Sequence, residues 1–303
     1  MNFAARSTPT KIAIVAAGIV FVFLIALLSL GLERYTPLVD RVLIEEAKRN
    51  NIKLIIPKSR LSWGGYSLVG AEALPMRVPV IVIEQLEVGP VWQRLLILDL
   101  WTQITGVLYG GLLEGLWDIQ LEKQSARGSF TLRDLGLERI PTLAFIGIYG
   151  TLSAKGTNVI LNNSSPAATL ALSIKDGGLR TPIKLSSIGL ALPLEIPSFD
   201  DLMLESNISF DTKHFNLSKL EIQSSLLKLN GSGRARALGP NPVFHGPASL
   251  QFDFEVSLSV EFLEQFSGFL PLISNNQLTK DSRSFKLKLS GSSNRPQTSF
   301  VPL

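Results

Sequence analysis

Side chains that could carry out acid–base or metal chemistry are few in this chain of 303 residues, and their spacing does not group them. The two histidines are His214 and His245, and neither stands in an H-x-x-x-H or H-E-x-x-H motif that would place two metal ligands on one helix face. The chain has no cysteine, which excludes disulfides, zinc–thiolate sites and a thiol nucleophile. We therefore interpret both histidines as solvated surface residues and predict no metal and no cofactor.

Two further motifs could be mistaken for a site. Gly231-Ser-Gly233-Arg-Ala-Arg236 could hold an anion with its backbone N–H groups, but glycines at this spacing are more typical of a hairpin. Asp200 and Asp201 form a carboxylate pair close to Pro197, which favours a surface loop. No G-x-S-x-G elbow, P-loop or dinucleotide fingerprint occurs. The sequence thus predicts no catalytic residues and a protein that is not an enzyme.

The charge distribution argues against nucleic acid as a partner. Lysine and arginine number 29, and aspartate and glutamate number 25, which gives a formal net charge of +4. The basic residues are scattered among the acidic ones. They form neither an arginine-rich run nor the basic and aromatic stripe that is typical of a nucleic-acid-binding surface.

An uncharged apolar segment near the amino terminus predicts a membrane anchor. Residues 12–32 read IAIVAAGIVFVFLIALLSLGL, and about 20 such residues cross the hydrocarbon core of a bilayer as a helix. Arg6 and Lys11 precede the segment, so the positive-inside rule places residues 1–11 in the cytoplasm and the rest of the chain on the other side. A cleaved signal peptide is the alternative, but its apolar core usually has only about 7–15 residues and is followed by an A-x-A site.

Residues 33–51 predict an amphipathic helix that links the anchor to the folded domain. Pro37 can occupy the first helical turn. Apolar residues then recur at helical spacing in Leu38, Val39, Val42, Leu43 and Ala47. Such a helix could bind a partner, but we favour a helix that covers the first strands of the domain.

From residue 52 to residue 303 the apolar pattern has a period of two, which predicts a β-rich domain. The clearest strand is 250–258, in which Leu250, Phe252, Phe254, Val256 and Leu258 alternate with polar residues. We take these five apolar residues as a candidate groove or core face. Asp176-Gly177-Gly178 is read as a hairpin turn between two such strands.

The predicted fold class is mainly β. Helical patterns are short and few, at 90–98, 135–145 and 260–270. Because so few helices cannot cover the apolar strand faces, we expect an antiparallel, curved or partly closed sheet: a half-open groove, a barrel or a sandwich. The domain could comprise two sub-units, about 52–157 and 158–303.

The order of several short motifs resembles a known family. These are Leu108-Tyr-Gly-Gly-Leu-Leu-Glu-Gly115, Leu137-Glu-Arg-Ile-Pro141, Ile148-Tyr-Gly-Thr-Leu152 and Phe285-Lys-Leu-Lys-Leu-Ser-Gly-Ser-Ser-Asn-Arg-Pro296. Together with the anchor and the linker helix they resemble the type II secretion system protein N family of Gram-negative bacteria, in its long form with a β-rich periplasmic part. The last motif is similar to the end of AsmA-like proteins. Residues 158–197 lie outside the resemblance.

This resemblance implies a protein of the bacterial inner membrane, with its amino terminus in the cytoplasm and its domain in the periplasm. Its first implication is a structural or accessory component of a type II protein secretion apparatus that contacts other secretion subunits. The alternative is an AsmA-like lipid-binding or lipid-transfer protein whose apolar β groove takes phospholipid. Neither implies a catalytic residue.

Overall fold

The computed structural model of the chain describes residues 32–49, 51–75, 80–91, 101–120, 125–162, 166–184, 195–239, 243, 246–268 and 270–303. These residues fall into two compact units, 1–90 and 91–303. The expected anchor, up to residue 31, and its flanking Arg6 and Lys11 lie outside the described residues. No helix within the described ranges is long and apolar enough to cross a membrane. The sub-unit boundary expected at 157 and 158 falls inside a strand, and the division follows Pro90 instead.

The first unit is a small antiparallel sheet beside one helix. Its elements are α2 (Thr36–Arg49), β1 (Ile52–Ile55), β2 (Lys58–Ser62), β3 (Gly65–Pro75) and β4 (Ile81–Pro90). β4 pairs with β3 along most of its length. β2 pairs with the first half of β3, and β1 pairs with its last four residues. Gly70, with φ of +68°, lies in β3 between these two pairings. The long strand β3 therefore organises the unit.

Helix α2 covers the first strands, as the sequence favours. Val39 packs against a cluster formed by Tyr66, Leu68 and Ala71. Asp40 accepts hydrogen bonds from the Tyr66 hydroxyl at 2.6 Å and from Ser59 Oγ at 2.7 Å. The Asp40 carboxylate thus joins α2 to both β2 and β3, which fixes the rotation of the helix against the sheet.

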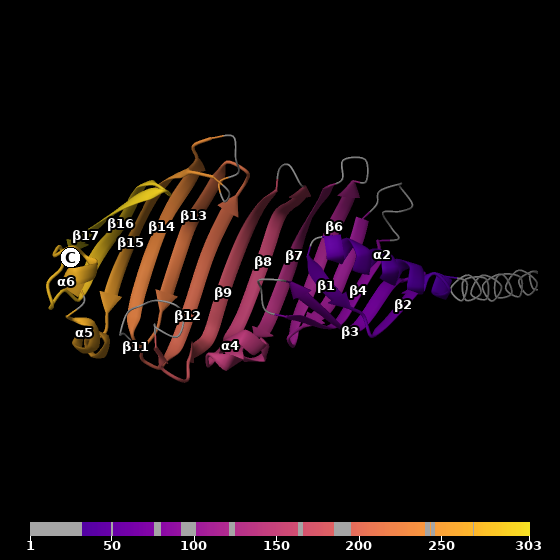
Figure 1. Ribbon diagram of the computed structural model, residues 1–303, viewed down its shortest axis with the longest axis horizontal. Helices are drawn as coiled ribbons and strands as arrows, with labels where there is room; N and C mark the ends of the chain where they lie inside the picture. The colour runs from indigo at the N-terminus through magenta and orange to yellow at the C-terminus, as the bar shows by residue number, and fades with distance from the viewer. Residues whose placement is uncertain are drawn as a thin grey trace, which may run out of the picture. The chain divides into compact units, whose positions relative to one another are not determined.

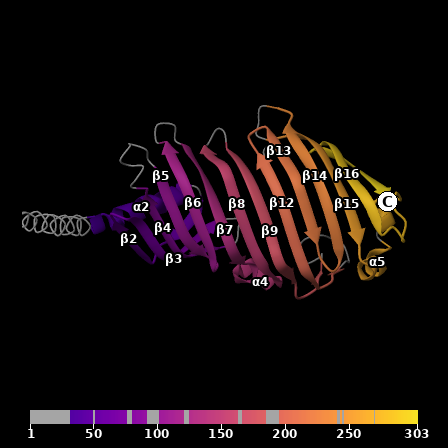
Figure 2. The same ribbon diagram turned by 180° about the vertical axis from the view of Figure 1, so that it is seen from behind.

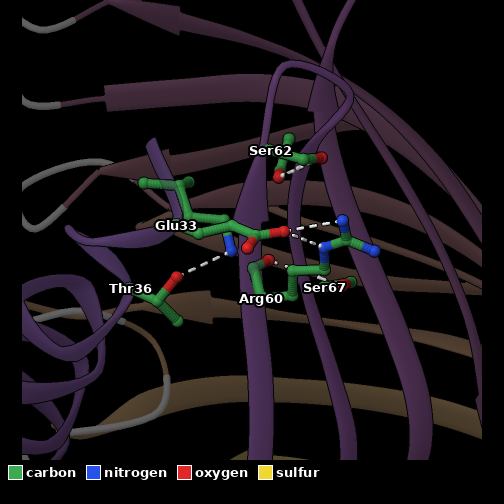
Figure 3. Close-up of polar contacts among 7 residues, drawn as sticks. Glu33, Thr36, Arg60, Ser62 and Ser67 are labelled. Atoms are coloured by element: carbon green, nitrogen blue, oxygen red, sulfur yellow. Dashed lines mark hydrogen bonds and ion pairs between the residues drawn. The ribbon is translucent and has the colours of Figure 1, made fainter. Parts of the chain in front are cut away.

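Two more polar contacts hold the start of α2 (Figure 3). The buried Thr36 accepts a hydrogen bond from the backbone N–H of Leu61 at 3.0 Å, and Arg60 Nε donates to Glu33 Oε1 at 2.6 Å. Both contacts come from β2, so the segment that leads from the expected anchor is tied to the sheet before the helix is complete.

The second unit is built on one antiparallel sheet whose strands follow their order in the chain (Figures 1 and 2). The strands are β5 (Trp101–Leu108), β6 (Gly111–Gln120), β7 (Ser125–Gly136), β8 (Ile148–Asn162), β9 (Ala167–Leu179), β12 (Phe199–Phe210), β13 (His214–Gln223), β14 (Leu227–Ala237), β15 (Ala248–Leu258), β16 (Ser284–Ser292) and β17 (Arg295–Pro302). The short strands β10 (Ile183–Lys184) and β11 (Glu195–Ile196) pair only with each other. Among the described strands β17 pairs only with β16, so the sheet does not close on itself.

The helices of the second unit are short and lie between strands. η2 (Leu137–Arg139) and α4 (Pro141–Phe145) occupy most of the helical segment expected at 135–145, whose first two residues belong to β7. The helix expected at 260–270 is divided into α5 (Val260–Phe266) and α6 (Leu270–Ile273). The Ser259 hydroxyl caps α5 by accepting the N–H of Phe262 at 3.1 Å. Most of the helix expected at 90–98 lies outside the described residues.

Bulges with an aspartate or asparagine at positive φ interrupt four successive strands. Asp134, Asn158, Asp176 and Asp201 have φ between +49° and +57°, and each lies where the register with a neighbouring strand shifts. Asp and Asn tolerate this left-handed conformation better than other residues with a side chain. The hairpin turn expected at Asp176-Gly177-Gly178 is therefore wrong, because this segment is a bulge inside β9. The loop expected at Asp200 and Asp201 is likewise part of β12.

Glycines on the sheet lie under aromatic rings of neighbouring strands. A Cβ atom on Gly233 would be 2.1 Å from Phe252 Cδ1, and one on Gly231 would be 2.2 Å from Phe254 Cδ1. The same holds for Gly156, whose Cβ would meet Phe130 Cε1 at 2.3 Å. The hairpin expected at Gly231 and Gly233 is therefore corrected: both residues lie within β14, where the absence of a side chain makes room for the rings.

We predict that Gly233→Val lowers the free energy of unfolding by about 1–3 kcal/mol, because the new side chain overlaps both the ring and the backbone of Phe252. The matched control is Ser232→Val on the same strand, whose side chain points to the exposed face and should change stability by less than about 0.5 kcal/mol. Urea denaturation of the full-length protein in detergent measures both. Equal effects of the two substitutions would contradict the packing of rings on glycines.

The contact between α2 and β3 should depend on pH through Tyr66. Burial, and then the hydrogen bond to Asp40, raise the pKa of Tyr66 from 10.0 to about 12. The neutral phenol is thus favoured by folding, and this contribution is complete below pH 10 and is lost as the pH rises from 10 to about 12.

We therefore expect Tyr66→Phe to cost about 1–2 kcal/mol at pH 8 and to flatten the loss of stability between pH 10 and 12. Thermal unfolding across this pH range provides the measurement. Tyr35→Phe, which alters an exposed ring, should show the same dependence of stability on pH as the natural protein. An unchanged profile in Tyr66→Phe would show that the phenol does not stabilise the docked helix.

Candidate functional site

One face of the second unit is lined by apolar residues from β5 to β17. The strand registers place these residues in three rows, each running across the strands. The rows are Ile104, Gly115, Phe130, Gly156, Leu170, Ile208, Leu217, Gly233, Phe252, Leu289 and Thr298; Gly106, Leu113, Leu132, Ala154, Leu172, Ser206, Leu220, Gly231, Phe254, Leu287 and Phe300; and Leu135, Leu152, Ile174, Leu204, Ile222, Leu229, Val256, Phe285 and Pro302. We call these three rows the apolar face. None of their members carries a charge.

The opposite face of the same strands is polar and carries exposed ion pairs. Lys219 Nζ lies 2.7 Å from Glu205 and 3.0 Å from Glu221. The hydrogen bond between Lys219 and Glu205 raises the pKa of the lysine and lowers that of the glutamate. Lys286 pairs with Glu255 at 2.9 Å. Because these pairs are solvated, they contribute little to stability, and their main consequence is a hydrated outer surface.

The five residues that the sequence singles out lie on the apolar face, in β15. Leu250, Phe252, Phe254 and Leu258 are partly buried, and Val256 is buried. The residues between them are exposed. Burial in β15 therefore alternates with the period that the sequence predicts.

Near β15 and β16 the apolar face is covered. Val256 and Phe285 form a buried cluster with Leu263 of α5, Leu270 of α6 and Leu278. Ser274 is buried beside them and fixes this cover, since its Oγ donates to the carbonyl of Leu270 at 2.6 Å and accepts the N–H of Leu278 at 2.9 Å. At the other end of these strands Val243 packs on Ala235 and Ala248. This part of the face is thus a closed core.

Between β6 and β13 the same face remains partly exposed. Leu113, Leu132, Leu170, Leu204 and Ile208 are neither buried nor fully exposed, whereas Leu135, Ser206 and Leu217 of the same rows are buried. Among the described elements of this unit, η2 and α4 lie at the strand ends, and α5 and α6 lie at the β15–β17 end (Figure 1). We call the apolar face from β6 to β13 the open region. It includes β9, which belongs to the stretch 158–197 that no motif of the sequence explains.

A shallow cavity of about 260 Å³ lies where β7, β8, β9 and β12 run side by side. Eight of its twelve lining residues alternate with the rows of the apolar face and so belong to the polar face: Thr131, Arg133, Ser153, Lys155, Ala171, Ser173, Glu205 and Asn207. Leu170 and Leu204, which belong to the first and third rows of the apolar face, do not line it. The cavity therefore lies on the polar face and is not part of the open region.

The residues considered first for chemistry are not brought together. His214 is exposed and its Nδ1 lies 3.2 Å from Asp211. Partial burial opposes a fall in the pKa of Asp211, but hydrogen bonds from the backbone N–H groups of Lys213 and His214 outweigh it and lower that pKa. This is a turn contact, and His245 lies outside the described residues. In the described part of the chain no three histidine, aspartate or glutamate side chains are placed to hold a metal ion.

Asp200, at the start of β12, accepts a hydrogen bond from the Tyr149 hydroxyl, which raises the pKa of that tyrosine. The Arg180 guanidinium lies 5.1 Å from the centre of the same ring. These three side chains tie the ends of β8, β9 and β12 together. It is a strand-end contact rather than a cleft.

Comparison of the chain with protein-family models, curated proteins and solved structures finds no match. The motifs that carry the family resemblance lie in the second unit. Tyr109 and Gly110 form the turn between β5 and β6, Ile148–Leu152 begins β8, and residues 285–296 form β16 and its turn into β17. Many of them are turn or strand-start positions, and their members on the apolar face are Leu113, Gly115, Leu152, Phe285, Leu287 and Leu289.

We predict that Phe254→Asp lowers the free energy of unfolding by about 3 kcal/mol or more, because Phe254 packs against the covered cluster and its place would be taken by a carboxylate. Glu255→Ser removes an exposed ion pair from the adjacent position and should cost less than about 0.5 kcal/mol. Chemical denaturation of both variants decides the matter. If Phe254→Asp were stable and Glu255→Ser unstable, the assignment of the buried and the exposed face of β15 would be reversed.

Proposed function

We propose that this chain is a membrane-anchored lipid-binding protein whose open region holds acyl chains. The observation that carries the proposal is an uncharged apolar sheet face that no described helix of the second unit covers between β6 and β13. Soluble proteins rarely leave a large contiguous apolar surface in water unless it binds something.

The chemistry of the open region favours an acyl chain over a peptide. The backbone N–H and C=O groups of these strands are used by the neighbouring strands, so the face offers a ligand almost no hydrogen bonds. An acyl chain needs none, and each buried methylene contributes about 0.8 kcal/mol. A polar peptide backbone laid on the same face would lose its hydration without replacement.

The size of the open region also suits a lipid. At ~4.8 Å between strands, the distance from β6 to β13 is ~24 Å. The hydrocarbon of one bilayer leaflet is only about half of ~30 Å thick. A complete acyl chain could therefore lie across the strands.

The anchor and its location belong to the same proposal. Residues 12–32 would span the bacterial inner membrane with residues 1–11 in the cytoplasm, and the two units would lie in the periplasm. Lipid would then be available close to the protein without a soluble carrier.

A second function rests on the edge of the sheet. Among the described strands β17 pairs only with β16, so its other edge could take a short strand from another protein between Pro296 and Pro302, whose missing N–H groups limit the pairing to that stretch. The resemblance to the type II secretion protein N family suggests that this partner is another secretion subunit, which would make the chain a structural or accessory component of that apparatus. Copurification of secretion subunits after cross-linking would support this role, which is compatible with lipid binding.

The lipid proposal is tested with a phospholipid that carries a photoreactive diazirine in its acyl chain. We expect the full-length protein in membranes to be labelled on peptides from β8, β9 and β12, in addition to the anchor. Leu170→Asp should reduce the labelling of these strands at least about fivefold, because a carboxylate in the open region repels the chain while remaining hydrated.

Ala171→Asp is the matched control, since Ala171 is adjacent but exposed on the polar face. It should keep normal labelling. Leu172→Ser, which removes apolar surface without adding charge, should give an intermediate loss in a folded protein. Labelling confined to residues 12–32 in the natural protein would disprove lipid binding by the sheet.

A further inference from the structure

The outer side of α2 carries an apolar stripe. Tyr35, Leu38 and Val42 are 59%, 61% and 59% exposed and follow one another at the spacing of one helix face. The neighbouring side of the helix is occupied, because Thr36, Val39 and Asp40 contact the sheet. The rotation of the helix is thus fixed, and the stripe points away from the first unit.

The stripe begins one turn after the apolar segment 12–32 ends. The backbone N–H of Tyr35 donates to the carbonyl of Leu32 at 2.9 Å, so these two residues belong to one hydrogen-bonded turn. With a rise of 1.5 Å per residue, Leu38 and Val42 lie about 3 Å and 9 Å along the helix axis from the start of α2 at Thr36. Pro37 occupies the first turn of α2, where its missing N–H group would have no partner within the helix.

The charges around the stripe fit a bilayer surface. Arg34 and Arg41 flank Leu38 on the exposed side. The nearby acid Glu33 is held by Arg60, and Glu45 and Glu46 pair with Arg41 and Arg49, both at 3.1 Å. A tyrosine, two aliphatic residues and arginines are the side chains that favour the boundary between headgroups and acyl chains.

We propose that the stripe Tyr35–Leu38–Val42 lies in the headgroup region of the membrane, so that α2 runs along the bilayer surface and holds the first unit against it. The inference rests on the anchor of the proposed function. Three side chains offer far less than the ~800 Å² per partner of a stable protein interface. A tethered membrane contact needs no such area, because the anchor keeps the local concentration of lipid high.

The absence of cysteine allows a direct test in the full-length protein. Single-cysteine variants Leu38→Cys, Val42→Cys and Pro37→Cys are labelled with bimane and reconstituted in vesicles of phosphatidylethanolamine and phosphatidylglycerol. A phospholipid with a nitroxide on carbon 5 of its acyl chain quenches labels at the boundary. Pro37 is exposed and closer to the anchor along the chain than the other two, but it lies about 100° from Leu38 around the helix.

We expect at least twofold stronger quenching at positions 38 and 42 than at position 37. Stronger quenching at 42 than at 37 cannot arise from closeness to the anchor alone and would place the stripe in the membrane. If the protein resists carbonate extraction but the labels are quenched equally or not at all, the inference is overturned while the anchor stands. Extraction of the protein by carbonate would overturn both. Labels unquenched in vesicles but protected from a thiol reagent in cells would assign the stripe to a protein partner instead.

Discussion

The fold of the second unit depends on keeping one face of every strand apolar while the strands change register. A shift of one residue would move the apolar set of a strand to the polar face. The bulges prevent this: Leu132 and Leu135 are three residues apart in β7, yet both face the same side because Asp134 takes up the extra residue at positive φ. Leu217 and Leu220 in β13 show the same spacing and the same register shift, without a positive φ. Each bulge thus preserves the face on which the covered core and the open region both depend.

Sequence periodicity predicts the strands that alternate without interruption and fails where a bulge intervenes. The strand at 250–258 and the helix after Pro37 were predictable because each pattern is local. The sequence Asp176-Gly177-Gly178 predicts a turn although it forms a bulge, because turns and bulges use the same residue types. The glycines of β14 also resemble turn residues, but their role is to make room for the rings of Phe252 and Phe254. These rings belong to the next strand, so a local pattern does not reveal the contact. β17 was missed because its exposed sequence, with Pro296 and Pro302, lacks the alternation of a buried strand.

The candidate site was predictable in kind but not in place. The five residues proposed from the sequence belong to the apolar face, but they lie in β15, where α5, α6 and Leu278 cover the adjoining cluster. The open region was not singled out, although Leu170 and Leu172 show the same alternation. Periodicity tells which side of a strand avoids water. Whether protein or a ligand covers that side depends on distant segments such as Ser274, whose two hydrogen bonds hold the cover in place.

An open apolar sheet must also avoid pairing with copies of itself. At its carboxyl-terminal edge, β17 carries Pro296 and Pro302, which lack an N–H group and limit the addition of a further strand. Lys219 and Lys286, with their acidic partners, keep the opposite face hydrated. These features limit pairing at the edge and keep the outer face hydrated. The open region carries no such charge, because a charged side chain in it would make the region unsuitable for an apolar ligand. Burial of that surface against acyl chains would relieve its contact with water without any change in the sheet, because every strand already has its hydrogen bonds. Burial of the apolar face, which stabilises the core under α5 and α6, would then favour the binding of a ligand in the open region a few strands away.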